Sequence, residues 1–532
     1  MEYIGSIIEL GVEIMLDLTS YTYSFEELIR GKFLYVDKTE YIWNMIRPAT
    51  AGYFLSRPRR FGKSLTVSTL KAVFQGKKEL FKGLAIYDKP YDWKQYPVIH
   101  LDMNGCKFNS VEELNHSLCS LLQEAGEDHQ ISLPDDEPNQ MFRNLIRQLS
   151  EKEQVVILLD EYDKPILNNL GEPHAEDILD NLKAFYSVIK AFENKERFVF
   201  VTGVSKFCHV SLFSDLNNLT DITMNRDYAT MFGYTQEEFE TYFADRIDFA
   251  CKQLNMPREE LLPEIKAWYD GYRFEEESET VYNPVSLAQF FVNSCKFNNY
   301  WFSTGTPSFL VELTKKADFN FEKTLSEPVM GLAFNAFEID KIDPLALLLQ
   351  TGYLTIKSSF VDLGETLYYL DFPNREVKSA FETYLISDYA SIPQETVGAN
   401  VFKMVKAIKA RDINLFMELL KTFFAAVQYD VATDTEGRFQ LLFYSVFLLI
   451  GVRIEAESRT NNGRIDAVIC DGDHVYIFEF KINQTAEIAL DQIREKEYFR
   501  KYQHSGRKII LTGANFDTVS RQITEWKSET VG

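Results

Sequence analysis

Two short stretches of the sequence combine residue types that can act on phosphate groups. The first is Gly62-Lys63-Ser64, which follows the apolar run 52–56. A loop leading from a strand into a helix can surround a phosphate with backbone N–H groups, and the helix N-terminus adds positive potential. In such a loop Gly62 lets the backbone approach closely. Lys63 would reach the β- and γ-phosphates of ATP, and Ser64 would be a ligand of Mg²⁺.

A second apolar run, "VVILLDE" at 155–161, ends in two adjacent acids, Asp160 and Glu161. Carboxylates at the end of a buried strand are costly unless a cation lies nearby. We therefore expect Asp160 to hold Mg²⁺ through water and Glu161 to polarise the attacking water. The alternative is a strand end whose acids only face solvent. Thr202, near the end of the run 197–204, is expected to sense the γ-phosphate, although an ordinary strand-end threonine would give the same pattern.

The loop departs from the usual phosphate-binding pattern at Arg57, where a glycine is expected. An arginine there removes the freedom to adopt positive φ, and Pro58 stiffens the loop further. Arg59 and Arg60 are expected to contact phosphate, but contacts with a lid or a neighbouring copy are alternatives. A homo-oligomer is therefore left open, with Arg59, Arg60 and Arg226 as candidates for an arginine supplied by another copy.

The second chemical stretch is "GRIDAVICDGDHVYIFEFKI" at 463–482. Twelve residues separate Asp466 from Glu479, and a turn at "DGDH" would place their two strands side by side. Carboxylates held in this way can share one or two Mg²⁺ ions, while Lys481 orients the attacking water and offsets the charge of the phosphorane. Glu436, on the preceding helix, would be a further metal ligand. Its alternative is an acid that only favours the helix dipole.

A helix is predicted after this stretch, and its apolar face consists of Ala486, Ala489, Leu490 and Ile493. Gln492 and Tyr498 stand where contacts with the phosphates or bases of a nucleic acid could be made. Several basic residues at the end of the helix add positive charge, but a solvated face is the alternative explanation for them.

The elements that must position these residues follow two patterns. From about 24 to 235, apolar runs alternate with helical patterns, which is typical of an open parallel α/β sheet with ligands at the carboxyl ends of its strands. The chain is then mostly helical to about 375, and helix, strand, strand at 345–377 suggests a small winged-helix lid. A second α/β pattern starts near 431. The apolar, acidic N-terminus is expected to form a local helix or an unstructured tail.

Composition limits the classes of function. The chain has 532 residues and a formal net charge of −23, which argues against a general surface for polyanions. Residues 401–532 hold 18 basic and 18 acidic side chains, so this part opposes nucleic acid least. Six scattered cysteines give no metal-binding spacing and indicate free thiols in a reducing cytoplasm. No apolar stretch is long enough for a membrane span, so no membrane partner is expected.

Several motifs together resemble a known bacterial family. "FLSRPRRFGKSLTVSTL", "LLDEYDKPI", "FVFVTGVSKF", "DGYRF" and "VYNPVSL" are similar to those of the predicted AAA-ATPase-like family, in which the loop form RPRRFGKS is normal. The "GRID", "FEFK" and "ALDQI" stretches look like the PD-(D/E)XK nuclease domain that accompanies it. The resemblance implies an α/β fold class: a P-loop NTPase core with an additional strand and a helical and winged-helix lid, followed by a restriction-endonuclease-like domain.

The expected domains follow from these patterns and from the resemblance. They are an N-terminal extension (1–23), the ATPase core (24–235), the lid (236–375), a helical linker (376–430) and the nuclease-like domain (431–532). The expected function is a cytoplasmic switch that binds and hydrolyses ATP, fused to a Mg²⁺-dependent nuclease, with DNA favoured over RNA as its substrate. One rival is a nucleotide-regulated scaffold that grips nucleic acid without cleaving it. The other is an NTPase whose C-terminal fold binds a protein partner.

Overall fold

The structure is a computed structural model that describes most of the chain. Outside the described residues lie 1–5, 10–11, 20–21, 207–217, 302–312, 315–320, 335–342, 428–434, 452–454, 462–463, 504–505 and 532. Contacts divide the chain into two compact units: residues 1–305 with 328–374, and residues 306–327 with 375–532.

The first unit is built on a five-stranded parallel sheet with the strand order β4-β5-β6-β3-β7. Because all strands run in one direction, their carboxyl ends lie at the same edge. Strand β6 stands between β3 and β5, which is the additional strand that the sequence motifs implied. The strands are β3 Ala51–Ser56, β4 Val98–Asp102, β5 Val155–Asp160, β6 Glu196–Gly203 and β7 Thr220–Asp221.

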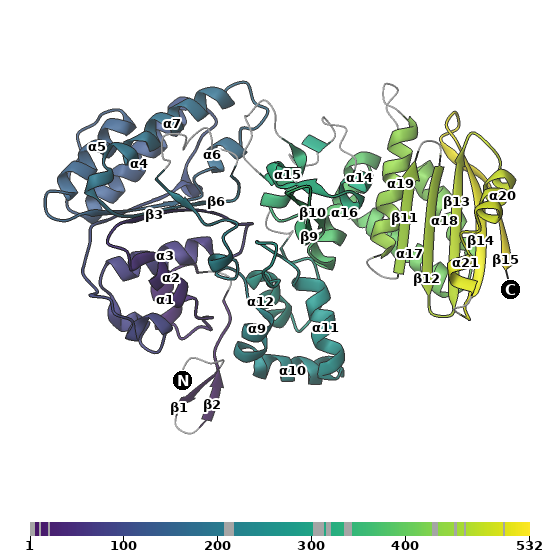
Figure 1. The fold of residues 1–532 in the computed structure, drawn as a ribbon, viewed down its shortest axis with the longest axis horizontal. Coiled ribbons are helices and arrows are strands. Elements are labelled where there is room, and N and C mark those ends of the chain that lie inside the picture. The colour runs from purple at the N-terminus through teal and green to yellow at the C-terminus, as the bar shows by residue number, and fades with distance from the viewer. Residues whose placement is uncertain are drawn as a thin grey trace. The chain divides into compact units, whose positions relative to one another are not determined.

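Helices cover both faces of this sheet (Figure 1). On one face α4, α5 and α7 share a hydrophobic core with the strands, and α1, α2 and α3 lie on the other face. Strands β5 and β6 are buried along their whole length, which explains their uninterrupted apolar sequences. The helices are α1 Phe25–Arg30, α2 Thr39–Ile46, α3 Lys63–Phe74, α4 Val111–Asp128, α5 Pro138–Leu149, α6 Lys164–Leu167 and α7 Ala175–Ala191.

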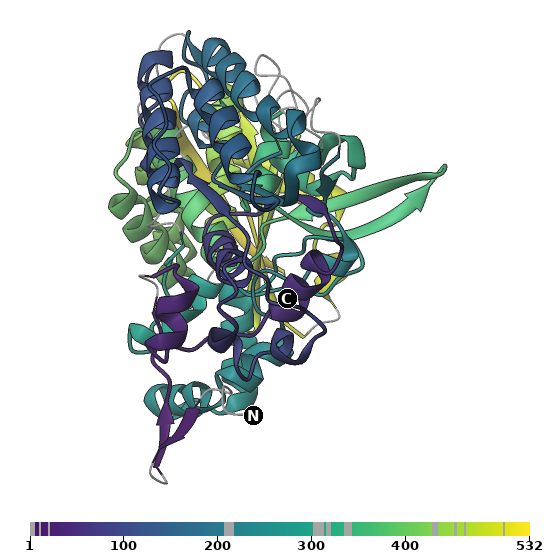
Figure 2. The ribbon, with the colours of Figure 1, turned by 90° about the vertical axis from the view of Figure 1, so that its left-hand side faces the viewer.

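The predicted lid consists of a helical part and a winged-helix part. The helices α9 Gln236–Tyr242, α10 Ala244–Leu254, α11 Arg258–Tyr269 and α12 Pro284–Val292 pack around an aromatic-rich core. Both hydrogen bonds of the capping box between Thr235 and Glu238 are present. The winged-helix part combines α15 Pro344–Gln350 with β8 Val329–Met330, β9 Thr355–Asp362 and β10 Glu365–Asp371 in the order β8-β10-β9. The β9–β10 hairpin is the long green pair of strands in Figure 2.

The second unit contains a mixed sheet in sequence order, β11-β12-β13-β14-β15, in which only the β13–β14 pair is parallel. Helix α20 connects β13 to β14 and packs on one face; a larger core fills the other. The elements are α14 Phe321–Ser326, α16 Arg375–Ala390, α17 Gln394–Lys409, α18 Ile413–Ala425, α19 Thr435–Gly451, β11 Glu455–Asn461, β12 Arg464–Asp471, β13 His474–Ile482, α20 Ala486–Lys496, α21 Arg500–Gln503, β14 Lys508–Asp517 and β15 Gln522–Val531.

In two stretches the structure differs from what the sequence predicted. The N-terminus was expected to be a helix or a tail, and this was wrong for the residues that are described there. They form an antiparallel hairpin of β1 Ser6–Glu9 and β2 Val12–Met15. The stretch 376–430, expected as a helical linker, is helical in its described residues, but its helices α17 and α18 share the large hydrophobic core of the C-terminal sheet.

Glu196 provides a test of the burial of the parallel sheet. It is 5% exposed at the start of β6. Burial raises the pKa of its carboxyl to about 8, with a smaller contribution from Glu193. An unfolded glutamate has a pKa of about 4.3. Between this pH and pH 8, the folded state therefore keeps a proton on Glu196 that the unfolded state has lost. The free energy of unfolding therefore falls as the pH rises through this window.

We accordingly expect Glu196→Gln to raise the thermal unfolding midpoint at pH 8.5 by about 2–5 °C and to change it little at pH 5. Differential scanning calorimetry at the two pH values measures this difference. Glu151→Gln, at an exposed position, is the matched control. An equal shift of the Glu196→Gln midpoint at both pH values would contradict a buried, protonated carboxyl.

Candidate functional site

The first site forms where β3 passes into α3. Helix α3 begins at Lys63, and Gly62 precedes it with φ 91°, a left-handed conformation that favours glycine. Arg60 also has a positive φ, 70°. The loop thus adopts positive φ at positions 60 and 62 and not at 57, so it needs no glycine at its first position.

Lys63 is the central cation of this site and is only 4% exposed. Its Nζ donates to the carbonyl oxygens of Arg57, at 3.1 Å, and Pro58, at 3.3 Å. Glu161 Oε1 lies 3.5 Å away. The predicted lysine of the loop and the predicted acid of β5 therefore meet, although more than ninety residues separate them in the chain.

Asp160 ends β5 and is 1% exposed. Burial raises the pKa of its carboxyl to about 6; the charge of Glu161 raises it further, whereas a hydrogen bond with Ser64 and the charge of Lys63 lower it. A carboxylate and a hydroxyl side by side are the oxygen ligands that Mg²⁺ accepts. A buried acid whose charged form is disfavoured is also a group that a cation would stabilise. The residues present thus fit Mg²⁺ bound with a nucleotide.

Thr202 and the two loop arginines take different positions around this cluster. Thr202 lies next to the end of β6 and is fully buried, and its Oγ1 has no hydrogen-bond partner among the described residues. Arg60 donates to the hydroxyl of Tyr23. Arg59 is exposed, and its carbonyl oxygen accepts from Trp301. Phosphate contacts by these three side chains remain predictions.

Arg57 has a role that the sequence could not reveal. It is 1% exposed, and its guanidinium donates to the carbonyl oxygens of Ser56, Thr223 and Tyr228. The same group lies 4.2 Å from the ring centroid of Phe274, a cation–π distance. Arg57 therefore attaches the start of the loop to the segment after β7 and to the "DGYRF" stretch.

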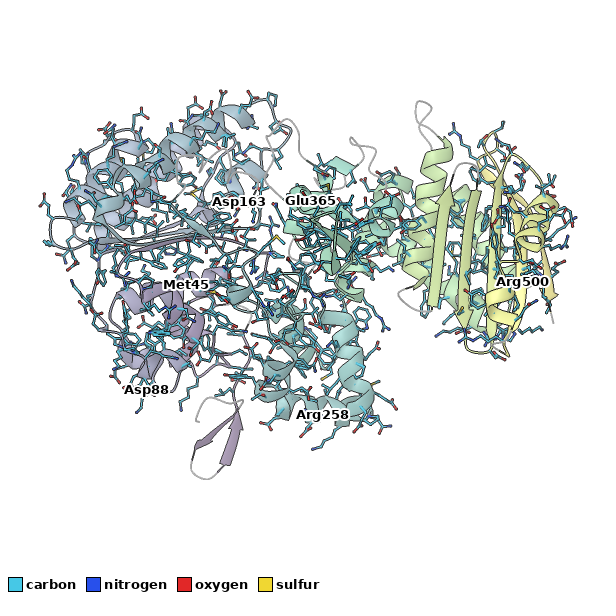
Figure 3. The ribbon with its side chains drawn as sticks, viewed as in Figure 1. Met45, Asp88, Asp163, Arg258, Glu365 and Arg500 are labelled. Carbon is cyan, nitrogen blue, oxygen red and sulfur yellow. The ribbon has the colours of Figure 1, made fainter. Side chains whose placement is uncertain are left out.

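Asp163 is a second residue whose importance the sequence left unclear. Its fully buried carboxylate accepts hydrogen bonds from the backbone N–H of Val204 and from both the N–H and the hydroxyl of Ser205. Figure 3 shows it at the sheet edge where the first site forms. A Cβ at Gly203 would lie 2.4 Å from the carboxylate, so only glycine fits there. Asp163 thereby holds the end of β6 against the acidic loop after β5.

The second site lies on β12 and β13 of the other unit. Asp466 pairs directly with Glu479 in the antiparallel register, so the two positions belong to the same face of the sheet. Glu479 is fully buried, and Lys481 Nζ lies 3.1 Å from its Oε1. The predicted pairing of the two strands through the turn at 471–474 is confirmed. The side chain of Asp466 lies outside the described residues, as does that of Glu436 on α19.

Helix α20 brings Gln492 to this site. Its amide oxygen accepts a hydrogen bond from Lys481 Nζ, so Gln492 contacts the candidate catalytic lysine directly. Tyr498 follows the helix and packs against the apolar cluster beneath it. The apolar face predicted for the helix is confirmed, since Ala486, Ala489, Leu490 and Ile493 are all buried. Binding of nucleic acid by Gln492 and Tyr498 stays a prediction.

A glycine on β14 allows α20 to approach the sheet beside Glu479. Gly513 pairs with Glu479 across the parallel strands. A Cβ at Gly513 would lie 2.4 Å from the carbonyl oxygen of Ala486 and 2.6 Å from the nitrogen of Leu490. Neither backbone atom can move without shifting the helix. The sequence pattern did not distinguish Gly513 from other glycines, because its pairing partner Glu479 lies 34 residues earlier in the chain.

Among the described side chains, no cluster of three or more His, Cys, Asp or Glu could hold a metal ion. At the nuclease-like site, the side chains of two of the three expected acids, Glu436 and Asp466, are not among the described ones. Oxygen ligands at Asp466 and Glu479 are nevertheless the donor type that Mg²⁺ prefers. Cys106, Cys119, Cys251, Cys295 and Cys470 are free thiols. No described helix combines the length and the apolar character needed to cross a membrane.

Comparisons with known proteins match the two parts of the chain that carry these sites. Residues 21–213 match the family described as predicted AAA-ATPase, and residues 434–526 match the PD-(D/E)XK nuclease superfamily. The chain therefore belongs to the predicted AAA-ATPase family and carries a C-terminal domain of the PD-(D/E)XK nuclease superfamily.

A curated relative matches along nearly the whole chain. It is an uncharacterized protein in the vnfD 5′ region of Azotobacter chroococcum mcd 1, 37% identical over 514 residues, which cover 94% of this chain and 96% of the relative. No solved structure matches. The family membership makes ATPase-type and nuclease-type chemistry the general kinds of activity to consider.

Proposed function

We propose that this protein binds and hydrolyses ATP and uses the nucleotide state to bias a Mg²⁺-dependent nuclease domain. The observation that carries the first half is the convergence of Lys63, Ser64, Asp160 and Glu161 at one edge of a parallel sheet. That edge is where open α/β sheets bind ligands. An acidic loop and a phosphate-type loop meeting there, in a family named for its ATPase motifs, support ATP as the ligand.

Each residue has a defined task in this proposal. Lys63 exchanges the carbonyl oxygens of Arg57 and Pro58 for phosphate oxygens of ATP. Ser64 and Asp160 would hold Mg²⁺, which neutralises charge on the transferred phosphoryl group when bound. Glu161, released from Lys63 by the same exchange, orients and polarises the attacking water. Thr202 offers its buried, unpartnered hydroxyl to the γ-phosphate.

The nuclease half rests on the register of β12 and β13. Asp466 and Glu479, together with Glu436, would hold Mg²⁺ beside the scissile phosphodiester. Lys481, held by Glu479 and Gln492, positions the attacking water and offsets the negative charge that develops. Gln492 and Tyr498 would contact the nucleic acid. The proposal includes a cytoplasmic location and DNA as the first substrate; plasmid DNA and an RNA of matched length in one cleavage assay test the latter.

Glu161→Gln tests the hydrolytic step separately from binding. We expect this variant to retain ATP binding and to lower the rate of phosphate release by about 100-fold or more, because the amide cannot polarise water as a carboxylate does. Equilibrium dialysis and a phosphate-release assay measure the two quantities. Glu176→Gln, at an exposed position of α7, is the control. An unchanged rate of phosphate release in Glu161→Gln would remove Glu161 from the mechanism.

A further inference from the structure

A pocket in the first unit lies beside the start of the phosphate-type loop and is separate from the cluster around Lys63. Its volume is about 50 Å³. Neither Lys63, Ser64, Asp160 nor Glu161 lines it. Most of its wall comes from four parts of the chain: Ser56–Pro58, the segment after β7 with Thr223, the "DGYRF" stretch, and the turn from α15 into β9; Lys206 and Phe334 complete it.

The chemical character of this wall is unusual for so acidic a protein. Most of the wall is apolar, including Phe274, Leu354 and Ile356. Three side chains in it are cationic, Arg57, Arg273 and Lys206, and no carboxylate lines the pocket. Lys206 already pairs with Asp221, at 2.7 Å. Two guanidinium groups therefore face an apolar space without a carboxylate among the lining residues.

Both arginines keep an unused donor. The Nε of Arg57 and the Nε of Arg273 are buried, and neither has a hydrogen-bond partner among the described residues. The remaining NH groups of Arg57 are directed to backbone carbonyl oxygens, and Arg273 donates to the carbonyl oxygen of Lys357. A buried donor without an acceptor costs free energy, and a buried cation without an anion costs more. Arg57 meets the first condition at 1% exposure. The carboxylate whose charge acts on it, Asp221, does not line the pocket and already pairs with Lys206.

From these observations we infer that the pocket binds a small oxyanion, whose oxygens accept from the Nε atoms of Arg57 and Arg273. Inorganic phosphate and short-chain carboxylates have this chemistry. One water needs roughly 10–15 Å³ on this scale, so a pocket of about 50 Å³ has room for a small oxyanion. The non-polar part of a carboxylate would contact Phe274, Leu354 and Ile356.

The pocket also links the loop to the winged-helix part. Gly352, at the turn from α15 into β9, has φ 87°, and a Cβ there would lie 2.7 Å from the ring of Pro58. Gln350 of α15 accepts from the backbone N–H of Lys206 at 2.8 Å. An anion held by Arg57 and Arg273 would join the loop to the "DGYRF" stretch at the same place. Its occupancy would therefore alter how readily the loop rearranges.

The test uses the full chain with Lys63→Ala, which removes the anion site expected at the loop itself. Sodium phosphate and sodium acetate are titrated in separate experiments, with sodium chloride at matched ionic strength, and followed by thermal shift and isothermal titration calorimetry. We expect a saturable shift with at least one oxyanion and none with chloride. Phosphate alone, acetate alone, or both would each support the site and identify its ligand.

Variants of the two arginines decide whether the signal comes from this pocket. In the Lys63→Ala background, Arg57→Lys keeps a cation but lacks Nε, and Arg273→Met removes the second donor. We expect each to weaken the oxyanion affinity at least about tenfold, while Arg147→Met, at an exposed position of α5, leaves it unchanged. Full affinity in both pocket variants, or no saturable shift with either oxyanion, overturns the inference. These titrations contain no nucleotide, so their outcome does not depend on whether the protein binds ATP.

Discussion

Metal-dependent cleavage of nucleic acid should fall by about 10³-fold or more when Glu479 is replaced by glutamine or Lys481 by alanine. Glu479→Gln removes the charge that would hold Mg²⁺ while keeping the shape of the side chain. Lys481→Ala removes the cation that would stabilise the developing negative charge. A plasmid-nicking assay with Mg²⁺ or Mn²⁺ measures both effects, and Glu495→Gln, exposed on α20, is the control.

The burial of this ion pair requires a second control. Glu479 is fully buried and Lys481 is nearly so, and removing one member of a buried pair destabilises a protein by about 3–5 kcal/mol. Lost cleavage in a single variant could therefore reflect a damaged fold. In Glu479→Gln with Lys481→Gln no charge is left unpaired, so it should recover stability relative to the single variants without recovering cleavage. Circular dichroism and thermal unfolding follow the fold.

Two outcomes would contradict the nuclease half of the proposal. One is cleavage by the double variant at the wild-type rate. The other is the absence of nicking by the wild type with any nucleotide or divalent metal, which would favour the scaffold that grips nucleic acid without cutting it. Unchanged thermal stability and ATPase rate in the presence of nucleic acid would favour the NTPase with a protein partner.

ATP affinity should fall by about 100-fold or more in Lys63→Ala. Lys63 Nζ lies 3.1 and 3.3 Å from the carbonyl oxygens of Arg57 and Pro58 and 3.5 Å from Glu161 Oε1, just after β5. Without it, the triphosphate loses a charge-assisted contact and faces Glu161 directly. Radiolabelled ATP in equilibrium dialysis measures the affinity.

Lys71→Ala is a matched control for this variant, since Lys71 lies on the same helix α3 and contacts only the surface acid Asp128 among the ion pairs described for it. It should bind ATP as the wild type does. Undiminished binding in Lys63→Ala would refute the placement of the phosphates at this loop. It would leave the oxyanion pocket untouched, because that site is tested in the Lys63→Ala background.

Local sequence patterns were enough to predict most of the elements that carry both sites. The apolar runs that became β3, β4, β5 and β6 were recognisable because strands buried on both faces have uninterrupted apolar sequences. Lys63 and Ser64 could be predicted because a phosphate-type loop is continuous in the chain. The pairing of Asp466 with Glu479 followed from a short turn, which fixes the register of an antiparallel hairpin.

Other features could not be read from the sequence because they depend on partners distant in the chain. The N-terminal residues looked helical or disordered, but each strand of the hairpin is only four residues long and too short for a clear period. The hydrogen bond between Gln492 and Lys481 is one such feature, since it forms only when α20 packs on the sheet; the contact of Gln492 with nucleic acid stays a prediction. The role of Asp163 has no local sequence signal, because its partners, Val204 and Ser205, lie about forty residues away.

The residues of the two candidate sites can be recognised in the sequence, because phosphate-type loops, strand-end acids and a hairpin of acids and lysine are each encoded within a few residues. The role of Arg57, in contrast, depends on the folded chain. Its carbonyl partners lie as far as Tyr228, and its stacking partner is Phe274. Hydrogen bonds and packing between such distant segments have no local period. They exist only once the strands have assembled and brought the two guanidinium groups of Arg57 and Arg273 to one pocket.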